Sequence, residues 1–163
     1  MSNPSEVQIA LDNREFEIQL FWQRTNYFLV LITALGIGVF TVEDNLFSTI
    51  LSILGTASSI LWFRTNLGSK FWQESWEVEV EILAKELGIR SFEKGITEIK
   101  QQVMSSLRDG EKNKKKSSYR KWIDGLIIKK YSVTQHMIFL SLVSTFLWLV
   151  ILSIFVLRLL GCL

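Results

Sequence analysis

Charged residues are absent from three long stretches of this 163-residue chain, at 27–42, 46–63 and 137–156. A helix on the surface of a soluble domain needs a polar face toward water, so these stretches argue against a soluble protein. A bilayer core of about 30 Å is spanned by about 20 apolar residues, and the first two stretches lie near the short limit. The sequence therefore predicts an all-α membrane protein with three transmembrane helices.

Groups that carry out chemistry are equally scarce. Cys162 and His136 are the only cysteine and histidine, which excludes an internal disulfide and a zinc site with the usual ligands. The sequence has no phosphate-binding glycine loop, His-Glu-x-x-His, nucleophile elbow or Cys-x-x-Cys motif. No charge lies deep within a span, where it would mark an ion path. We expect no enzyme activity, no cofactor and no metal, and the net charge of +2 does not favour nucleic acid as a partner.

Basic residues are missing from the short loop at 43–45, whereas 64–135 contains 15 of the 18 Lys and Arg residues. Because Lys and Arg near span ends tend to stay in the cytoplasm, we expect the N-terminus inside and the C-terminus outside. The predicted divisions are a cytoplasmic amphipathic helix at 1–24, a transmembrane hairpin at 25–63, a cytoplasmic helical region at 64–135 and a third span at 136–160.

The N-terminal helix carries apolar residues at Ile9, Phe16, Leu20 and Phe21, with charges between them. Such a helix can lie on the bilayer surface or pack against a neighbouring subunit, and both placements remain open.

Small residues in the second span recur at spacings of four, three and four, at Ser48, Ser52, Gly55 and Ser59. This spacing places them on one helical face. Small residues let another membrane helix approach closely, so the face is either a helix-packing surface or the lining of a mildly polar pore.

Polar residues gather where the first two spans reach the cytoplasm: Arg24, Asn26, Trp62, Arg64 and Asn66. In a hairpin these two ends lie side by side. Ordinary anchoring at the membrane interface is the favoured interpretation. The alternative is that Asn26 and Asn66 bond across the helices and that the arginines hold phosphate headgroups or Glu17.

The second span has no helix breaker at its end, which predicts one helix running to about Leu87 and closed by Gly88. A second polar helix is expected from Ser91. Its apolar stripe would pack as an antiparallel hairpin on the stripe of the first, with help from other subunits. The first stripe, the predicted assembly surface, consists of Trp72, Trp76, Val80, Leu83 and Leu87. The second consists of Phe92, Ile96, Ile99, Val103 and Leu107.

A basic loop follows at 109–118, with Lys112, Lys114, Lys115 and Lys116. These side chains either attract anionic lipid or are simply solvated. A short helix at the headgroups is predicted within 119–131, and Ser132 with Gln135 is typical of the capping box that opens a helix.

Several segments resemble a known family. They are RTNYFLVLITAL, LWFRTNLGSKFWQESWEVEVEILAKELG and KYSVTQHMIFLSLVSTFLWLVIL. The chain resembles the RipA-type family of small octameric bacterial inner-membrane proteins. The shared positions are Asn26, Phe28 and Leu29, then Trp62 and Arg64, then Glu86 and Leu87, and finally Ser132 and Thr134. The resemblance implies a homo-oligomer, an octamer, in the bacterial cytoplasmic membrane. It is weakest at 91–131 and supplies no catalytic residues.

Two functional hypotheses follow. The first is a non-enzymatic, homo-oligomeric inner-membrane protein whose cytoplasmic helices mediate assembly and bind a protein partner or ligand. The second is a pore-forming or membrane-disrupting effector of an anti-phage defence system. A membrane enzyme ranks third, because no reacting constellation is recognisable in the sequence.

Overall fold

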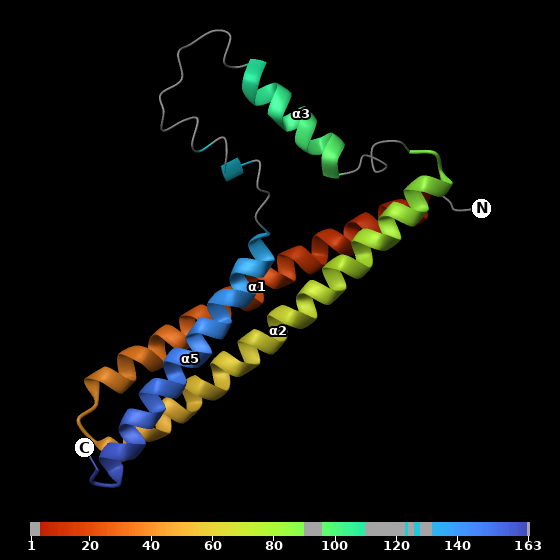
Figure 1. The fold of residues 1–163 in the computed structure, drawn as a ribbon. Helices are drawn as coiled ribbons and strands as arrows, with labels where there is room; N and C mark the ends of the chain where they lie inside the picture. The colour runs from red at the N-terminus through yellow and green to blue at the C-terminus, as the bar shows by residue number, and fades with distance from the viewer. Residues whose placement is uncertain (1–3, 90–95, 110–122, 124–125, 128–131, 163) are drawn as a thin grey trace.

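The computed structural model describes residues 4–89, 96–109, 123, 126–127 and 132–162. Its helices are α1 (Pro4–Thr41), α2 (Asn45–Glu86), α3 (Ile96–Asp109) and α5 (Val133–Leu159) (Figure 1). Helices α1, α2 and α5 are long and apolar enough to cross a membrane. The predicted all-α class and the three spans are therefore confirmed. The basic loop with Lys112, Lys114, Lys115 and Lys116, and most of 119–131, lie outside the described residues.

Helices α1 and α2 form a long antiparallel hairpin closed by a turn of three residues. Asp44 caps α2, and its side chain accepts a hydrogen bond from the Leu46 amide at 2.9 Å. Helix α1 continues without a break through residue 24, where the sequence predicted the boundary between the amphipathic helix and the first span. The N-terminal part of α1 lies along α2 of its own chain, with Val7 and Ala10 buried. Neither of the two placements predicted for this segment included that one, because neither paired the segment with the predicted extension of the second helix to Leu87.

The predicted single helix through the second span and beyond is confirmed as α2, which has 42 residues. Its C-terminal end has the geometry of a Schellman motif. Gly88 adopts a φ of 67°, its amide donates to the Lys85 carbonyl at 3.1 Å, and the Ile89 amide donates to the Ala84 carbonyl at 2.9 Å. Glycine stops the helix here because it adopts positive φ without steric cost.

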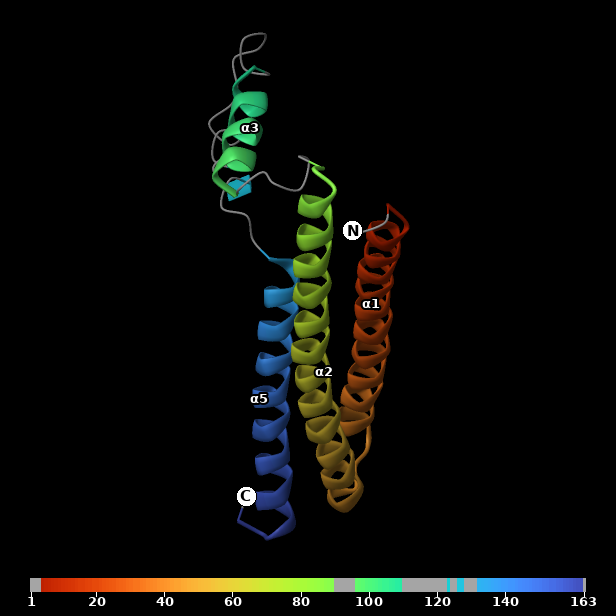
Figure 2. The ribbon, with the colours of Figure 1, turned by 90° about the vertical axis from the view of Figure 1, so that its right-hand side faces the viewer.

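Helix α5 packs along α2, so α2 lies in the middle with α1 and α5 on either side (Figure 2). Ser132 caps α5, as predicted, by accepting from the Gln135 amide at 3.4 Å. Helix α3 corresponds to the predicted second polar helix. The extensive contacts of α2 are with α1 and α5, and among the described residues no comparable packing joins α2 to α3. The α2–α3 hairpin stays a prediction.

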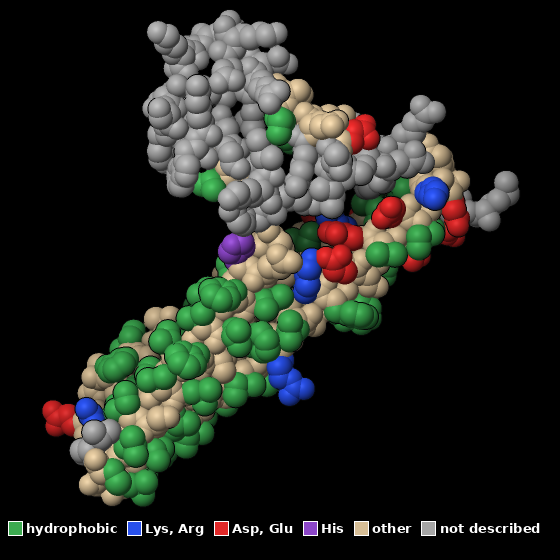
Figure 3. Space-filling model, viewed as in Figure 1, with side chains coloured by type: hydrophobic (Ala, Val, Ile, Leu, Met, Phe, Trp, Pro, Cys, Tyr) green, Lys and Arg blue, Asp and Glu red, His purple; other side chains and the backbone are tan. Residues whose placement is uncertain are grey.

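The three packed helices divide into two sections along their length (Figure 3). Hydrophobic side chains cover the membrane section, which is formed by 27–42, 46–63 and 137–156. Acidic and basic side chains gather over the polar rod, which is formed by 4–24 of α1 and 64–86 of α2.

Candidate functional site: a polar seam along helix α2

One face of α2 is buried along almost its whole length. From residue 48 to residue 73, eight of its ten buried positions alternate at spacings of four and three, which is the repeat of a coiled-coil seam, and Thr49 and Thr56 are buried beside them. Most of the side chains on this face are small or polar. The face, called the polar seam, consists of Ser48, Ser52, Gly55, Ser59, Trp62, Asn66, Ser69 and Gln73.

Three α2 residues of the seam, seven apart in sequence, bond to α5. Gln73 Oε1 accepts from the Thr134 hydroxyl at 3.1 Å. The Asn66 amide donates to the Met137 carbonyl at 3.2 Å and to the Ser141 hydroxyl at 3.3 Å. The Ser59 and Ser144 hydroxyls are 3.1 Å apart. Hydrogen bonds of this kind hold membrane helices together, because lipid offers buried polar groups no other partner.

Gly55 lets α5 approach most closely. A Cβ atom added at Gly55 would lie 2.3 Å from the Trp148 ring, so the indole occupies the space that a side chain would need. Trp148 is itself buried and forms an apolar cluster with Val39 of α1 and Phe155 of α5. The seam therefore joins all three helices of the membrane section.

The hydroxyl groups at the far end of the seam bond to nearby backbone. Ser52 donates to the Ser48 carbonyl and Thr56 donates to the Ser52 carbonyl, both at 2.8 Å. Ser48 bonds to the Val42 carbonyl at 3.3 Å. The predicted small-residue face is thus buried within one chain; the hydroxyl groups of Ser48 and Ser52 are paired with nearby backbone, and that of Ser59 is paired with Ser144 of α5.

The five residues of the predicted interfacial cluster differ in their burial and in their partners. Arg24 donates to the Ser69 hydroxyl at 3.2 Å and lies 3.9 Å from Glu17, the acidic residue expected near it. Trp62 is buried and stacks on Phe28, with 6.4 Å between ring centroids.

Asn26 and Asn66 do not bond to each other, so that interpretation of the cluster is wrong. Asn66 is buried and turns to α5, whereas Asn26 and Arg64 are exposed. The α1 residue that is buried at this level is Thr25, so the rotation of α1 carries Asn26 away from the seam.

The predicted assembly stripe does not coincide with the buried face of α2. Val80 is buried, and Trp76, Leu83 and Leu87 are half-buried, but Trp72 is 50% exposed. The buried position beside Trp72 is Gln73. A pattern of apolar residues does not include Gln73, a polar side chain that bonds to another helix. The three-four spacing that starts at Ser48 does include it.

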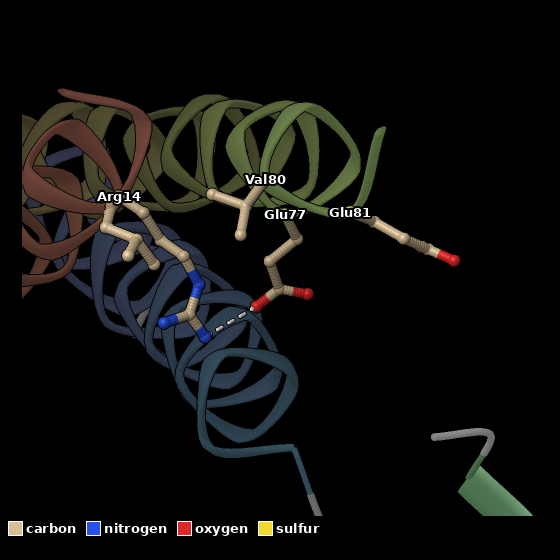
Figure 4. A pocket seen from close by; sticks show the side chains of 5 residues that line it. Arg14, Glu77, Val80 and Glu81 are labelled. Carbon is tan, nitrogen blue, oxygen red and sulfur yellow. Dashed lines mark hydrogen bonds and ion pairs between the residues drawn. The ribbon is translucent and has the colours of Figure 1, made fainter. Parts of the chain in front are cut away.

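A pocket of about 220 Å³ lies between α1 and α2 of the polar rod, and the sequence did not reveal it. It is lined by Leu11, Arg14, Glu77, Val80 and Glu81. Arg14 and Glu77 point toward each other and form an ion pair at 3.2 Å, while Glu81 points away from them (Figure 4). Counting residues from the turn pairs Arg14 with Trp72, five positions short of Glu77, so the pair is evident only in the structure.

Acidic, histidine and cysteine side chains form no group of three able to hold a metal ion in the part of the chain that the structure describes. His136 is exposed at the start of α5, with its ring Nδ1 2.7 Å from the Ser132 carbonyl. Cys162 is exposed beyond the end of α5.

Three apolar helices joined by a seam of small and polar residues define a helical membrane protein. The chain belongs to the octameric membrane protein family (8xMP), whose profile matches residues 5–157. It is accordingly an oligomeric membrane protein, as the resemblance in its sequence implied. No curated protein and no solved structure matches the chain significantly.

Proposed function

We propose that this protein is a non-enzymatic assembly and docking platform of the bacterial cytoplasmic membrane. The observation that carries the proposal is the polar rod, which extends α1 and α2 beyond their apolar segments. Phe21, Val80 and Ala84 are buried in it, so it is a packed extension of the bundle. A rigid rod outside the lipid offers a surface that a water-soluble partner can reach.

The charge distribution supports a cytoplasmic rod. The loop at 43–45 has no basic residue, and 64–135 has most of the Lys and Arg of the chain. Basic segments next to spans remain preferentially inside, which puts the N-terminus and the rod in the cytoplasm and the C-terminus outside.

The chemistry of the rod indicates the kind of partner. Residues 4–24 and 64–86 contain nine acidic and five basic side chains, so a partner with a basic surface fits best. The pocket at Arg14 and Glu77 supplies an anchoring point, because it combines an ion pair with the apolar side chains of Leu11 and Val80.

Orientation is tested with single thiols. Cys162 is the only cysteine, and a membrane-impermeant maleimide should label it in intact spheroplasts. A Glu81→Cys variant that also carries Cys162→Ser should be labelled only after permeabilisation. The reverse pattern would place the rod outside and end the proposal of a cytoplasmic platform.

Docking is tested with a photoreactive amino acid at Glu81 and, as a matched control, at Glu43 in the loop at the other end of the hairpin. We expect the Glu81 probe to give a defined cross-linked product with a second protein that a further Glu77→Lys change weakens severalfold. If illumination yields only cross-links between copies of this chain, the rod serves assembly alone.

The second candidate is a pore-forming effector in anti-phage defence. In its favour, polar side chains follow α2 through the whole membrane section. Against it, α5 covers this face and Trp148 fills the space over Gly55, so a lumen there requires α5 to separate from α2. Ion flux through liposomes that is lost in Ser52→Leu and Ser59→Leu would support a pore. If these variants assemble, and neither they nor the unchanged protein conduct ions, a pore is excluded.

A further inference from the structure

A second apolar stripe follows α2 on the face opposite the polar seam. It occupies positions 47, 50, 54, 57, 61, 64, 68, 71, 75, 78 and 82, which again alternate at spacings of three and four. Every one of these residues is exposed. The apolar side chains of this outer stripe are Phe47, Ile50, Leu54, Ala57, Leu61, Phe71, Val78 and Ile82, and its other members are Arg64, Gly68 and Ser75. Two such stripes on one helix are suited to contacts with two different layers of protein.

Lipid accounts for only half of the outer stripe. The apolar segment of α2 ends at residue 63, and Ile82 lies about 28 Å beyond it at 1.5 Å per residue. Phe71, Val78 and Ile82 are 67%, 54% and 49% exposed, and they continue the three-four register of the membrane section beyond Arg64 and Gly68, which occupy the stripe at the boundary. Apolar side chains in water favour burial against protein. A stripe with apolar side chains on both sides of the boundary is therefore best covered by another helix that also crosses it.

A neighbouring subunit can provide that helix, because the proteins of this family are octamers. In a ring around an axis normal to the membrane, a residue of one copy meets residues at its own depth in the next copy. Helix α5 is too short for the distal part of the stripe, since Thr134 at its start already contacts Gln73. Helix α1 reaches that depth and has its own exposed apolar face, with Ile9, Phe16, Val30 and Ile37 at 58%, 57%, 70% and 62% exposed.

Contacts within the chain set the register between the two faces. Arg14 lies level with Glu77 and Arg24 lies level with Ser69, so Phe16 lies level with Ser75. Ser75 is the small residue between Phe71 and Val78 on the outer stripe. A bulky ring opposite a small residue that is flanked by large ones is the geometry of a knob in a hole.

We infer that the outer stripe of α2 in one copy packs on the outer face of α1 in the next, with Phe16 seated over Ser75. This contact deepens the assembly role proposed above and rests on it. It is heterologous, because the two surfaces differ, so it can close a ring. It joins subunits both inside the bilayer and in water.

Cysteine cross-linking in native membranes tests the contact. Two differently tagged copies, both carrying Cys162→Ser, are expressed together, one with Phe16→Cys and the other with Ser75→Cys. Mild oxidation should give a dimer that bears both tags, because a disulfide requires Cβ atoms about 4 Å apart. A single chain that carries both cysteines should give a ladder of products up to eight chains. Pairing Phe16→Cys with Leu54→Cys is the depth-mismatched control and should give no product.

The outcomes separate the inference from the assembly role. Links between two copies of Ser75→Cys, or between Val78→Cys and Val103→Cys of α3, would show a rod that assembles through other faces and would overturn the inference alone. Thiols that react with maleimide but form no cross-link, in a protein that remains oligomeric, would also overturn the inference alone, and a protein that is monomeric in native membranes would overturn both. As a second readout, Ser75→Trp should reduce the octamer to smaller species while Ser153→Trp on α5 leaves it intact. An unchanged octamer in Ser75→Trp would contradict the inference.

Discussion

The two sections of the α1–α2–α5 bundle are built with opposite chemistry. In the polar rod most of the buried side chains are apolar, with Phe21, Val80 and Ala84 among them, and the charged ones are exposed or half-buried. In the membrane section the α2 side chains buried most completely are hydroxyls, such as Ser52 and Ser59, and the exposed ones are Leu, Ile and Phe. Helix α2 takes part in both arrangements without a break.

The difference shows what holds each section together. Water favours burial of apolar surface at about 25 cal/mol per Å², and this drives α1 onto α2 in the rod. Lipid provides no such driving force between helices, so close approach and hydrogen bonds replace it. Gly55 under Trp148 supplies the close approach, and Ser59 with Ser144 supplies a hydrogen bond.

A charge placed inside the rod should give the largest effect. Val80 is 3% exposed, and Val80→Asp would bury an unpaired carboxylate. We expect the rod to lose about 3 kcal/mol of stability. Trypsin cleavage after Arg14 and Arg24 should accelerate strongly while the membrane section stays protected. Gln19→Asp, an exposed position of the same rod, should leave the cleavage rate nearly unchanged. Equal rates in both variants would mean that the rod is not held by its apolar interior.

Two glycines of the membrane section should respond to alanine with opposite signs. An alanine Cβ at Gly55 would collide with Trp148, whereas one at Gly36 would meet nothing within 4 Å. Gly55→Ala should therefore destabilise the bundle by about 1–3 kcal/mol through overpacking. Gly36→Ala should stabilise α1 by up to about 1 kcal/mol through helix propensity. Thermal unfolding in detergent distinguishes the two, and a higher midpoint for Gly55→Ala would show that Trp148 does not rest on α2.

The smallest effect is expected for a single hydrogen bond of the polar seam. A double-mutant cycle of Asn66→Leu and Ser141→Ala should give a coupling energy of about 0.6 kcal/mol, typical of such bonds between membrane helices. Ser153→Ala is the matched control, because that hydroxyl bonds to the Leu149 carbonyl of its own helix. Unfolding from mixed micelles by denaturant supplies the free energies. Zero coupling would show that the bond between Asn66 and Ser141 contributes nothing to the attraction between α2 and α5.

Much of the fold could be read from the sequence, because lipid and water impose different compositions on a chain. The three apolar stretches, the long α2 ended at Gly88 and the Ser132 cap all follow from local rules. The small face at Ser48, Ser52, Gly55 and Ser59 was also recognisable by its spacing. Its partner was not, since spacing shows that a face exists and does not show which helix covers it.

The candidate site was harder to predict for the same reason. Asn66 was identified, but with Asn26 as its partner in place of Met137 and Ser141. The predicted apolar stripe includes Trp72 and not Gln73, because apolar spacing does not reveal a buried polar side chain. The ion pair of Arg14 and Glu77 joins residues 63 positions apart, and it emerges only once the two helices are aligned.

By itself the sequence determined which segments lipid solvates, where the helices begin and end, and which α2 residues are small enough for close contact. Those properties depend on neighbouring residues and on the solvent. The tertiary structure alone decided that α1 lies on α2, that α5 covers the small face, and that a polar seam runs inside an apolar surface. Each of these results from the rotation of one helix against another, which depends on side chains far apart in the chain.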